Sequence, residues 1–161
     1  MSIKSVFAVP FAKRIRKRVY KWANSPYKTQ DKVFKMLLKK AQNTAFGKDH
    51  DFKNIKTYAD FKNQVKVQDY EGLSPYVNRV VAGEKDVLWK GVPLYFAKTS
   101  GTTSGAKYIP ITKDSMPTHI KAARNALLLY IAEKKDASFV DGKMIFLQGS
   151  PVLESKHVIK L

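Results

Sequence analysis

The chain lacks cysteine altogether, and its 13 acidic side chains are few beside 30 lysines and arginines. The absence of cysteine excludes a disulfide framework and any chemistry that needs a thiolate. The three histidines, His50, His119 and His157, stand without the close His/Cys/carboxylate spacing of a metal site, so we predict no metal ligands in this chain. No apolar run reaches the roughly 18 residues that a membrane span needs.

A short apolar segment, residues 5–12, lies near the start of the chain. It differs from a secretory signal because Pro10 interrupts it and a basic run follows in place of a small-residue cleavage site. We therefore expect the protein to be cytoplasmic.

The composition indicates a globular domain that carries a large excess of basic side chains. A hydrophobic content of 44% and an aromatic content of 12% over 161 residues indicate a globular domain with its own core. The net charge is +17, and residues 1–50 hold 13 of the basic side chains against Asp31 and Asp49 alone. The excess is therefore concentrated in an N-terminal arm.

Within this arm, residues 1–28, the spacing predicts an amphipathic helix over residues 10–23. Ile15, Val19 and Trp22 recur at helical spacing. The basic side chains fall elsewhere on the wheel: Arg14, Arg16, Lys17, Arg18 and Lys21. Such a helix can pack on the rest of the protein, or be drawn weakly to an anionic surface. Both interpretations stay open, and we expect no specific binding of nucleic acid.

Periodicity and turn residues predict the remaining elements. The expected helices are one N-capped by Thr29, a short one capped by Thr57, one from Ser74 to Gly83, and a long one capped by Asp114 or Ser115. The apolar stripe of the long helix comprises Ile120, Ala123, Leu127, Leu128 and Ile131. Residues 43–51 are rich in turn formers, and strands are expected over 87–89, 94–98, 108–111 and 143–147.

The most informative run lies between the strands expected at 94–98 and 108–111. It alternates glycine, hydroxyl residues and one lysine: Ser100, Gly101, Thr102, Thr103, Ser104, Gly105 and Lys107. Glycine allows positive φ, so backbone N–H groups can turn inward, and short hydroxyls add donors without filling the hollow. With the lysine charge, these residue types predict a cradle for a polyphosphate.

The run also has features of three other structures. A Walker A loop requires Gly-Lys-Ser/Thr, and here Lys107 does not directly follow Gly105, which excludes it. Ser104 and Lys107 spell Ser-x-x-Lys, as in serine β-lactamases, but β-rich residues follow and the companion motifs are missing. The plain alternative is a surface hairpin loop, which such a composition can also form.

The run resembles the phosphate-binding loop of adenylate-forming enzymes, Thr-Ser-Gly-Thr-Thr-Gly-x-Pro-Lys-Gly. Its departures, Ser104, a late Gly105 and Ala106, point to the auxin-responsive acyl acid amido synthetases. A second stretch, residues 67–84, contains Tyr70-Glu71 and later Pro75-Tyr76. It is similar to the Tyr-Glu…Pro-Tyr-Ile-x-Arg-Ile segment of that family, so the resemblance runs from about residue 30 to the C-terminus.

The resemblance implies an α/β fold, the N-terminal part of the large domain of an adenylate-forming enzyme. N-terminal helices would be followed by strands that flank the Ser/Thr/Gly phosphate loop. Residues 1–28 would form the basic arm, and residues 29–161 the start of the adenylate-forming domain. Because members of the family are several times longer, we expect this chain to be a truncated piece without synthetase activity of its own.

The implied function is activation of a carboxylic acid by ATP as an acyl adenylate, followed by amide formation with an amino acid. By resemblance, Ser100, Thr102, Thr103 and Ser104 contact the β,γ-phosphates, Gly101 and Gly105 shape the turn, and Lys107 adds charge. Thr102, Thr103 and Lys107 would thereby serve catalysis, while the Mg²⁺ ligands are expected outside the chain. The alternative is a non-catalytic anion-binding module whose basic arm contacts nucleic acid or anionic lipid.

Overall fold

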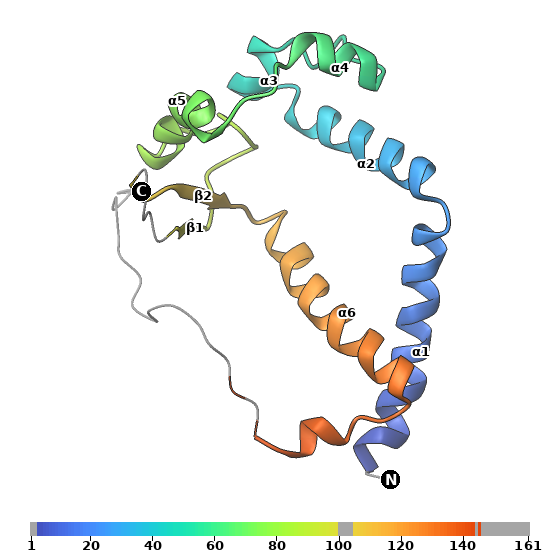
Figure 1. Ribbon diagram of the computed structural model, residues 1–161. Coiled ribbons are helices and arrows are strands. Elements are labelled where there is room, and N and C mark those ends of the chain that lie inside the picture. The colour runs from blue at the N-terminus through green and yellow to red at the C-terminus, as the bar shows by residue number, and fades with distance from the viewer. Residues whose placement is uncertain (1–2, 100–104, 144, 146–161) are drawn as a thin grey trace. The chain divides into compact units, whose positions relative to one another are not determined.

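The computed structural model describes residues 3–99, 105–143 and 145, and within them the chain divides into two compact units. The first unit combines the residues up to Thr29 with those from Pro117 onward, and the second comprises Gln30–Met116. Figure 1 gives the order of the elements along the chain. Each unit has its own buried hydrophobic cluster.

The described part of the first unit contains two long helices, α1 (Ile3–Ala23) and α6 (Met116–Lys134), and a 3-10 turn, η1 (Ser138–Asp141). Its buried cluster is wholly aliphatic: Val9, Ala12, Ile15, Leu128, Ile131, Ala132 and Ala137. Three of these are alanines that are almost completely buried, which indicates close packing around small side chains. At the surface, Arg16 Nη1 lies 3.4 Å from Glu133 Oε2.

Both long helices differ in part from their predicted outlines. α1 begins seven residues before Pro10, which lies inside the helix although it offers no N–H to it. Trp22, predicted on the apolar face of α1, is 54% exposed. In α6 the predicted stripe is buried only in part, since Leu128 and Ile131 are covered while Ile120 is 62% and Leu127 48% exposed.

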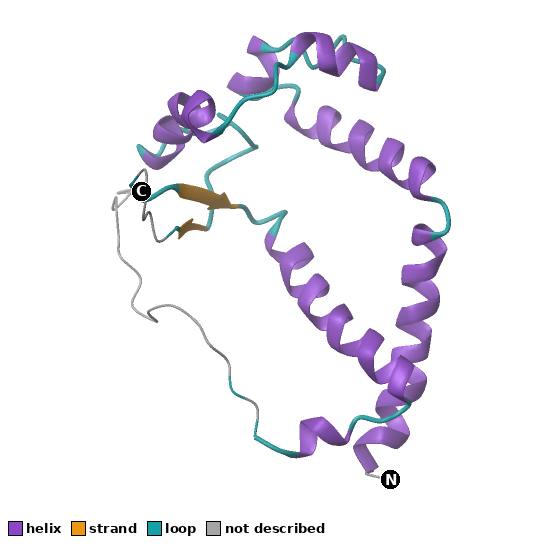
Figure 2. Cartoon of the chain, viewed as in Figure 1, coloured by secondary structure: helices purple, strands orange, loops and turns teal. Residues whose placement is uncertain are grey.

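Among its described residues, the second unit holds four helices and a two-stranded sheet. Figure 2 colours these helices purple and the strands orange. The helices are α2 (Pro26–Ala41, which begins in the first unit), α3 (Ala45–Asp49), α4 (Tyr58–Gln64) and α5 (Tyr70–Val81). Its buried cluster is Leu38, Ala41, Phe52 and Ile55, covered by the partly buried Phe34, Phe46, Phe61, Val65 and Trp89. Several of these rings meet edge to face, as Phe34 and Phe61 do with centroids 5.6 Å apart.

Side-chain caps set the helix starts in this unit. Thr57 caps α4 in a capping box with Asp60, which confirms the predicted cap. Thr44 caps α3 within the segment predicted to be turn-rich. Asp69 caps α5 by accepting from the N–H of Gly72, so this helix begins at Tyr70 and not, as predicted, at Ser74.

The prediction that Thr29 caps the second helix is wrong. α2 already begins at Pro26, a residue type favoured at the first helical position, and the Thr29 hydroxyl instead donates to the carbonyl of Trp22 at 3.3 Å. Asp114 and Ser115, the predicted alternative caps of α6, have side-chain hydrogen bonds to residues that precede the helix. Asp114 accepts from Lys40 Nζ at 2.8 Å, while Ser115 exchanges hydrogen bonds with Thr112.

The two strands are β1 (Tyr95–Lys98) and β2 (Tyr108–Ile111), which confirms the predicted pair to within one residue. They pair antiparallel, with Tyr95 opposite Ile111 and Lys98 opposite Tyr108. Residues 87–89, predicted as a strand, form a loop in which the Val87 carbonyl accepts from the N–H of Phe46. The strand predicted over 143–147 falls largely outside the described residues. The described elements are thus mixed helix and sheet, compatible with the expected α/β class.

Candidate functional site

The predicted phosphate loop joins β1 to β2, and the structure describes its two ends. Ser100, Gly101, Thr102, Thr103 and Ser104 lie outside the described residues. Thr99 on one side, and Gly105 and Lys107 on the other, are described. The described part of the site therefore consists of these ends and of the helix that they contact.

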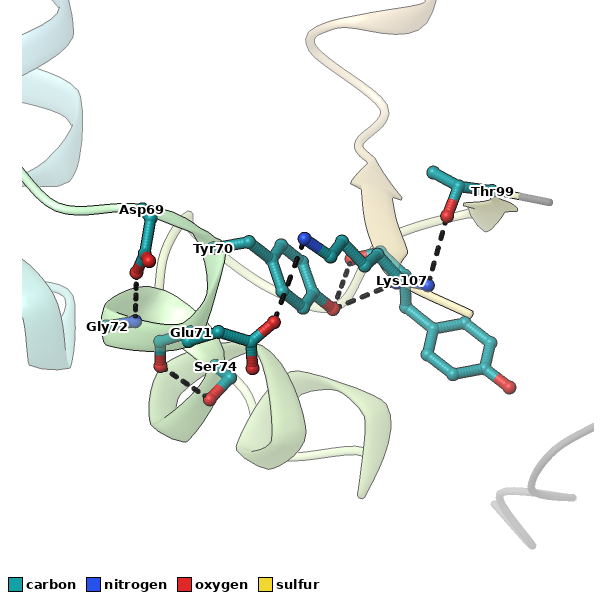
Figure 3. A network of polar contacts seen from close by, with 8 residues as sticks. Asp69, Tyr70, Glu71, Gly72, Ser74, Thr99 and Lys107 are labelled. Atoms are coloured by element: carbon teal, nitrogen blue, oxygen red, sulfur yellow. Dashed lines mark hydrogen bonds and ion pairs between the residues drawn. The ribbon is translucent and has the colours of Figure 1, made fainter. Parts of the chain in front are cut away.

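Backbone hydrogen bonds close the hairpin below the loop. The N–H of Thr99 donates to the Lys107 carbonyl at 3.0 Å. The N–H of Lys107 donates to Thr99 Oγ1 at 3.1 Å (Figure 3). Gly105 has a φ of +80°, a conformation that glycine adopts without strain. A Cβ at this position would meet no heavy atom within 4 Å, so backbone conformation and not lack of space favours glycine here.

The first turn of α5 contacts the residue that follows Lys107. Along one strand of an antiparallel pair, backbone N–H and C=O groups point alternately toward the partner strand and away from it. Lys107 is hydrogen-bonded to Thr99, so the N–H and C=O of the next residue, Tyr108, point away from β1. The Tyr70 hydroxyl meets both groups: it accepts from the N–H of Tyr108 at 2.9 Å and donates to its carbonyl at 3.4 Å. One phenol thus ties the start of β2 to α5.

The Lys107 side chain lies over the same turn of α5. Its Nζ is 5.0 Å from the centre of the Tyr70 ring and 3.7 Å from Glu71 Oε1. Figure 3 shows the lysine reaching across the ring toward the carboxylate. Each of these interactions is worth about 1 kcal/mol or less at a solvent-accessible site, so together they orient the ammonium without locking it.

Local hydrogen bonds hold Tyr70 and Glu71 in place. Asp69 Oδ1 accepts from the N–H of Gly72 at 2.9 Å, which fixes the start of the helix. The Ser74 hydroxyl donates to the Glu71 carbonyl at 2.7 Å. Both partners of Lys107 therefore sit on a capped helical turn and not on a free loop.

Sequence reasoning missed the contact of Tyr70 and Glu71 with the loop. The signal was present, because Tyr70-Glu71 opens the second family-like stretch. That stretch served as evidence of resemblance alone, since a spacing of 38 residues between Tyr70 and Tyr108 does not indicate contact.

Three carboxylates of the second unit have a lowered pKa. A hydrogen bond from Arg79 lowers the pKa of Glu84, and one from Lys40 lowers that of Asp114. Backbone N–H groups of Thr57 and Lys56 lower the pKa of Asp60. In the part of the chain that the structure describes, no three His, Cys, Asp or Glu side chains gather as a metal site would require, and Mg²⁺ binding elsewhere stays a prediction.

Residues 15–157 match the family model described as the GH3 family N-terminal domain. The chain belongs to the GH3 family. The match spans most of the chain and confirms the resemblance to the auxin-responsive acyl acid amido synthetases.

Two curated plant proteins are similar to this GH3 chain. One is the jasmonoyl–L-amino acid synthetase JAR4 of Nicotiana attenuata, 22% identical over 132 residues, which are 80% of this chain and 22% of that protein. The other is the indole-3-acetic acid-amido synthetase GH3.2 of Arabidopsis thaliana, 28% identical over 115 residues, 71% of this chain and 20% of that protein. The chain therefore spans about a fifth of the length of these relatives. No solved structure matches.

Among the described residues, none of the helices combines the length and the apolar character needed to cross a membrane.

Proposed function

We propose that this GH3 chain supplies the phosphate-contacting loop of an acyl acid amido synthetase. Such an enzyme uses ATP to activate a carboxylic acid as an acyl adenylate, then transfers the acyl group to the amine of an amino acid. The named activities of the two plant relatives support this class of substrates. We further propose a cytoplasmic location.

One observation carries the proposal beyond family membership. The two stretches that resemble the synthetases, residues 67–84 and 99–111, contact each other directly in the fold. Tyr70 hydrogen-bonds to the residue after Lys107, and Glu71 attracts the lysine itself. This contact supports the view that the two stretches form parts of one site.

The chemistry explains why such a loop is needed. A carboxylate is a poor electrophile, and its attack on the α-phosphate of ATP brings one anion toward another. Negative charge then grows on the departing pyrophosphate, where preorganised donors lower the barrier. We assign this role to the hydroxyls of Ser100, Thr102, Thr103 and Ser104 and the ammonium of Lys107, on a turn shaped by Gly101 and Gly105. Mg²⁺, whose ligands we expect outside this chain, would add positive charge.

A loop graft tests the proposal. Residues 99–111 replace the aligned segment of the Arabidopsis relative, and ATP–pyrophosphate exchange is measured with indole-3-acetic acid. We expect the graft to support exchange, and Thr103→Val in the graft to lower kcat about a hundredfold, or about 3 kcal/mol, with little change in KM. Thr103→Ser, which keeps the hydroxyl, is the matched control and should retain most of the activity. A kcat within twofold of the graft for Thr103→Val would contradict a catalytic role for the hydroxyl.

The alternative, a non-catalytic anion-binding module, draws on exposed cations of α1. Arg14, Lys17 and Arg18 are exposed there, whereas Arg16 is paired with Glu133. If this face attracts anions, changing the three exposed residues to glutamine should lower retention on heparin. The control removes the same charge from exposed lysines of the second unit, Lys53, Lys56 and Lys62. Equal losses in the two triple variants would show that net charge, and not the arm, determines retention.

A further inference from the structure

We infer that Tyr70 and Glu71 act in opposite senses on the lysine of the loop. Tyr70 is a positioning residue for Lys107, and Glu71 is a counter-charge that a phosphate ligand of Lys107 must displace. The inference deepens the proposed function and rests on it. It concerns described residues alone.

The positioning role follows from the two contacts of one side chain. The Tyr70 hydroxyl holds the backbone N–H and C=O of Tyr108, and the Tyr70 ring lies 5.0 Å below the Lys107 ammonium. Together these contacts restrain both the backbone next to the lysine and the position of its charge. Replacing Tyr70 by phenylalanine would keep the ring and remove only the hydrogen bonds.

The role of Glu71 as a counter-charge follows from the geometry of its ion pair with Lys107. The Lys107–Glu71 distance of 3.7 Å is longer than a charge-assisted hydrogen bond, and the Glu71 side chain is 63% exposed while that of Lys107 is 32% exposed. Such a pair is weak, so the oxygens of a multiply charged phosphate can replace the carboxylate. The Glu71 charge also repels that ligand, so a neutral side chain here should strengthen binding.

The test measures binding of inorganic tripolyphosphate to the full 161-residue chain by calorimetry at physiological ionic strength. Lys107→Met, which keeps the stem and removes the charge, should weaken binding about ten- to a hundredfold. Tyr70→Phe should weaken it about two- to tenfold, the effect of a lost hydrogen bond. Glu71→Gln should tighten it about two- to fivefold.

Two matched controls separate these effects from general ones. Tyr95→Phe removes a hydroxyl from an exposed tyrosine of the same hairpin, and Glu133→Gln removes the acid of an exposed ion pair in the first unit. Both should bind tripolyphosphate like the unmodified chain. Thermal unfolding reports whether each variant is folded, and the ¹⁵N-resolved amide signal of Tyr108 reports whether its hydrogen bond to residue 70 has been lost.

The outcomes distinguish the two levels of the argument. If Lys107→Met weakens binding but Tyr70→Phe does not, the lysine contact stands and the positioning role is overturned. If Glu71→Gln fails to tighten binding, the counter-charge role is overturned. If Lys107→Met leaves affinity unchanged, or the unmodified chain binds nothing, the proposed phosphate contact fails. In that case the amide signal of Tyr108 still tests the hydrogen bond of Tyr70. A shift of this signal in Tyr70→Phe supports the bond to the backbone, and an unchanged signal contradicts it.

Discussion

The buried clusters of the two units are built on different principles. The cluster of the first unit is aliphatic and joins α1 to α6, which lie near opposite ends of the described chain. The cluster of the second unit draws on residues 34–89 and is rich in aromatic rings. The first therefore depends on closing a very long loop, whereas the second can form from contacts that are closer in sequence. The second unit, which also contains the candidate site, can thus form from local contacts, whereas the unit that contains the basic arm depends on long-range closure.

The two tryptophans make this comparison measurable. Trp22 lies in α1 of the first unit, and Trp89 packs against the cluster of the second. Because the chain has two tryptophans, a Trp→Phe change at either position leaves a fluorescence signal from one unit. Each stability prediction below can be followed by urea denaturation in both single-tryptophan backgrounds.

The largest effect is expected from the aromatic cluster. Phe52 is 9% exposed and meets the ring of Phe46 edge to face at 5.8 Å. Phe52→Ala should lower the free energy of unfolding by about 4 kcal/mol, through lost transfer energy and the cavity left behind. The Trp89 signal should shift more than the Trp22 signal. The control Tyr27→Ala, at an 86% exposed ring, should change little, and equal shifts of both tryptophans would show that the units unfold as one.

A smaller loss is expected in the aliphatic cluster. Ile131 of α6 is 5% exposed and belongs to the cluster that α6 shares with α1. Ile131→Ala should lower the free energy of unfolding by about 3 kcal/mol. The fluorescence of Trp22 should report most of this change. Ile120 on the same helix is 62% exposed, so Ile120→Ala is the matched control and should cost under about 0.5 kcal/mol. Similar costs for the two isoleucines would contradict the burial pattern of α6.

The next smaller loss of stability is expected from removal of a helix cap. Thr57 caps α4, so Thr57→Ala should lower the free energy of unfolding by about 1 kcal/mol, and Thr57→Ser should restore most of it. Thr29 lies inside α2, so the same change there should cost clearly less. A larger loss at Thr29 would favour the cap that the sequence first indicated.

The smallest difference in stability between the two units is expected at acidic pH. Asp60, Glu84 and Asp114 all belong to the second unit, and hydrogen bonds lower the pKa of each from ordinary values of 3.8, 4.5 and 3.8. A lowered folded pKa gives stability that is present above the ordinary value and lost as the pH falls through the folded one. The Trp89 transition should therefore weaken below about pH 4.5, and less steeply in Asp114→Asn. An unchanged slope in that variant would remove Asp114 from the explanation.

Several elements could be predicted because their signals are local. The capping box at Thr57 needs one residue three positions later, and β1 and β2 are short β-rich runs that border the loop. The starts of α2 and α5 were misplaced because Thr29 and Ser74 compete with better signals at Pro26 and Asp69. Residue preferences for helix starts do not by themselves decide which of two nearby residues begins the helix.

The candidate site was predictable only in its composition. Glycines, hydroxyls and Lys107 indicate an anion loop from sequence, but the partners of the lysine come from α5. Their contact depends on tertiary packing over dozens of residues, for which neither helical period nor turn chemistry carries a signal. Burial in α6 escaped prediction for the same reason, since the stripe does not reveal which of its residues meet α1.

The Tyr70 hydroxyl also has a consequence for self-association. The outward-facing backbone of β2 comprises positions 108 and 110, and an exposed strand edge of this kind can template pairing with another chain. Tyr70 occupies the N–H of Tyr108, and Pro110 has no N–H to give. An incoming strand would thus find no open donor along this side of β2. Tyr70 and Pro110 together therefore protect this edge of the hairpin against intermolecular β-sheet growth.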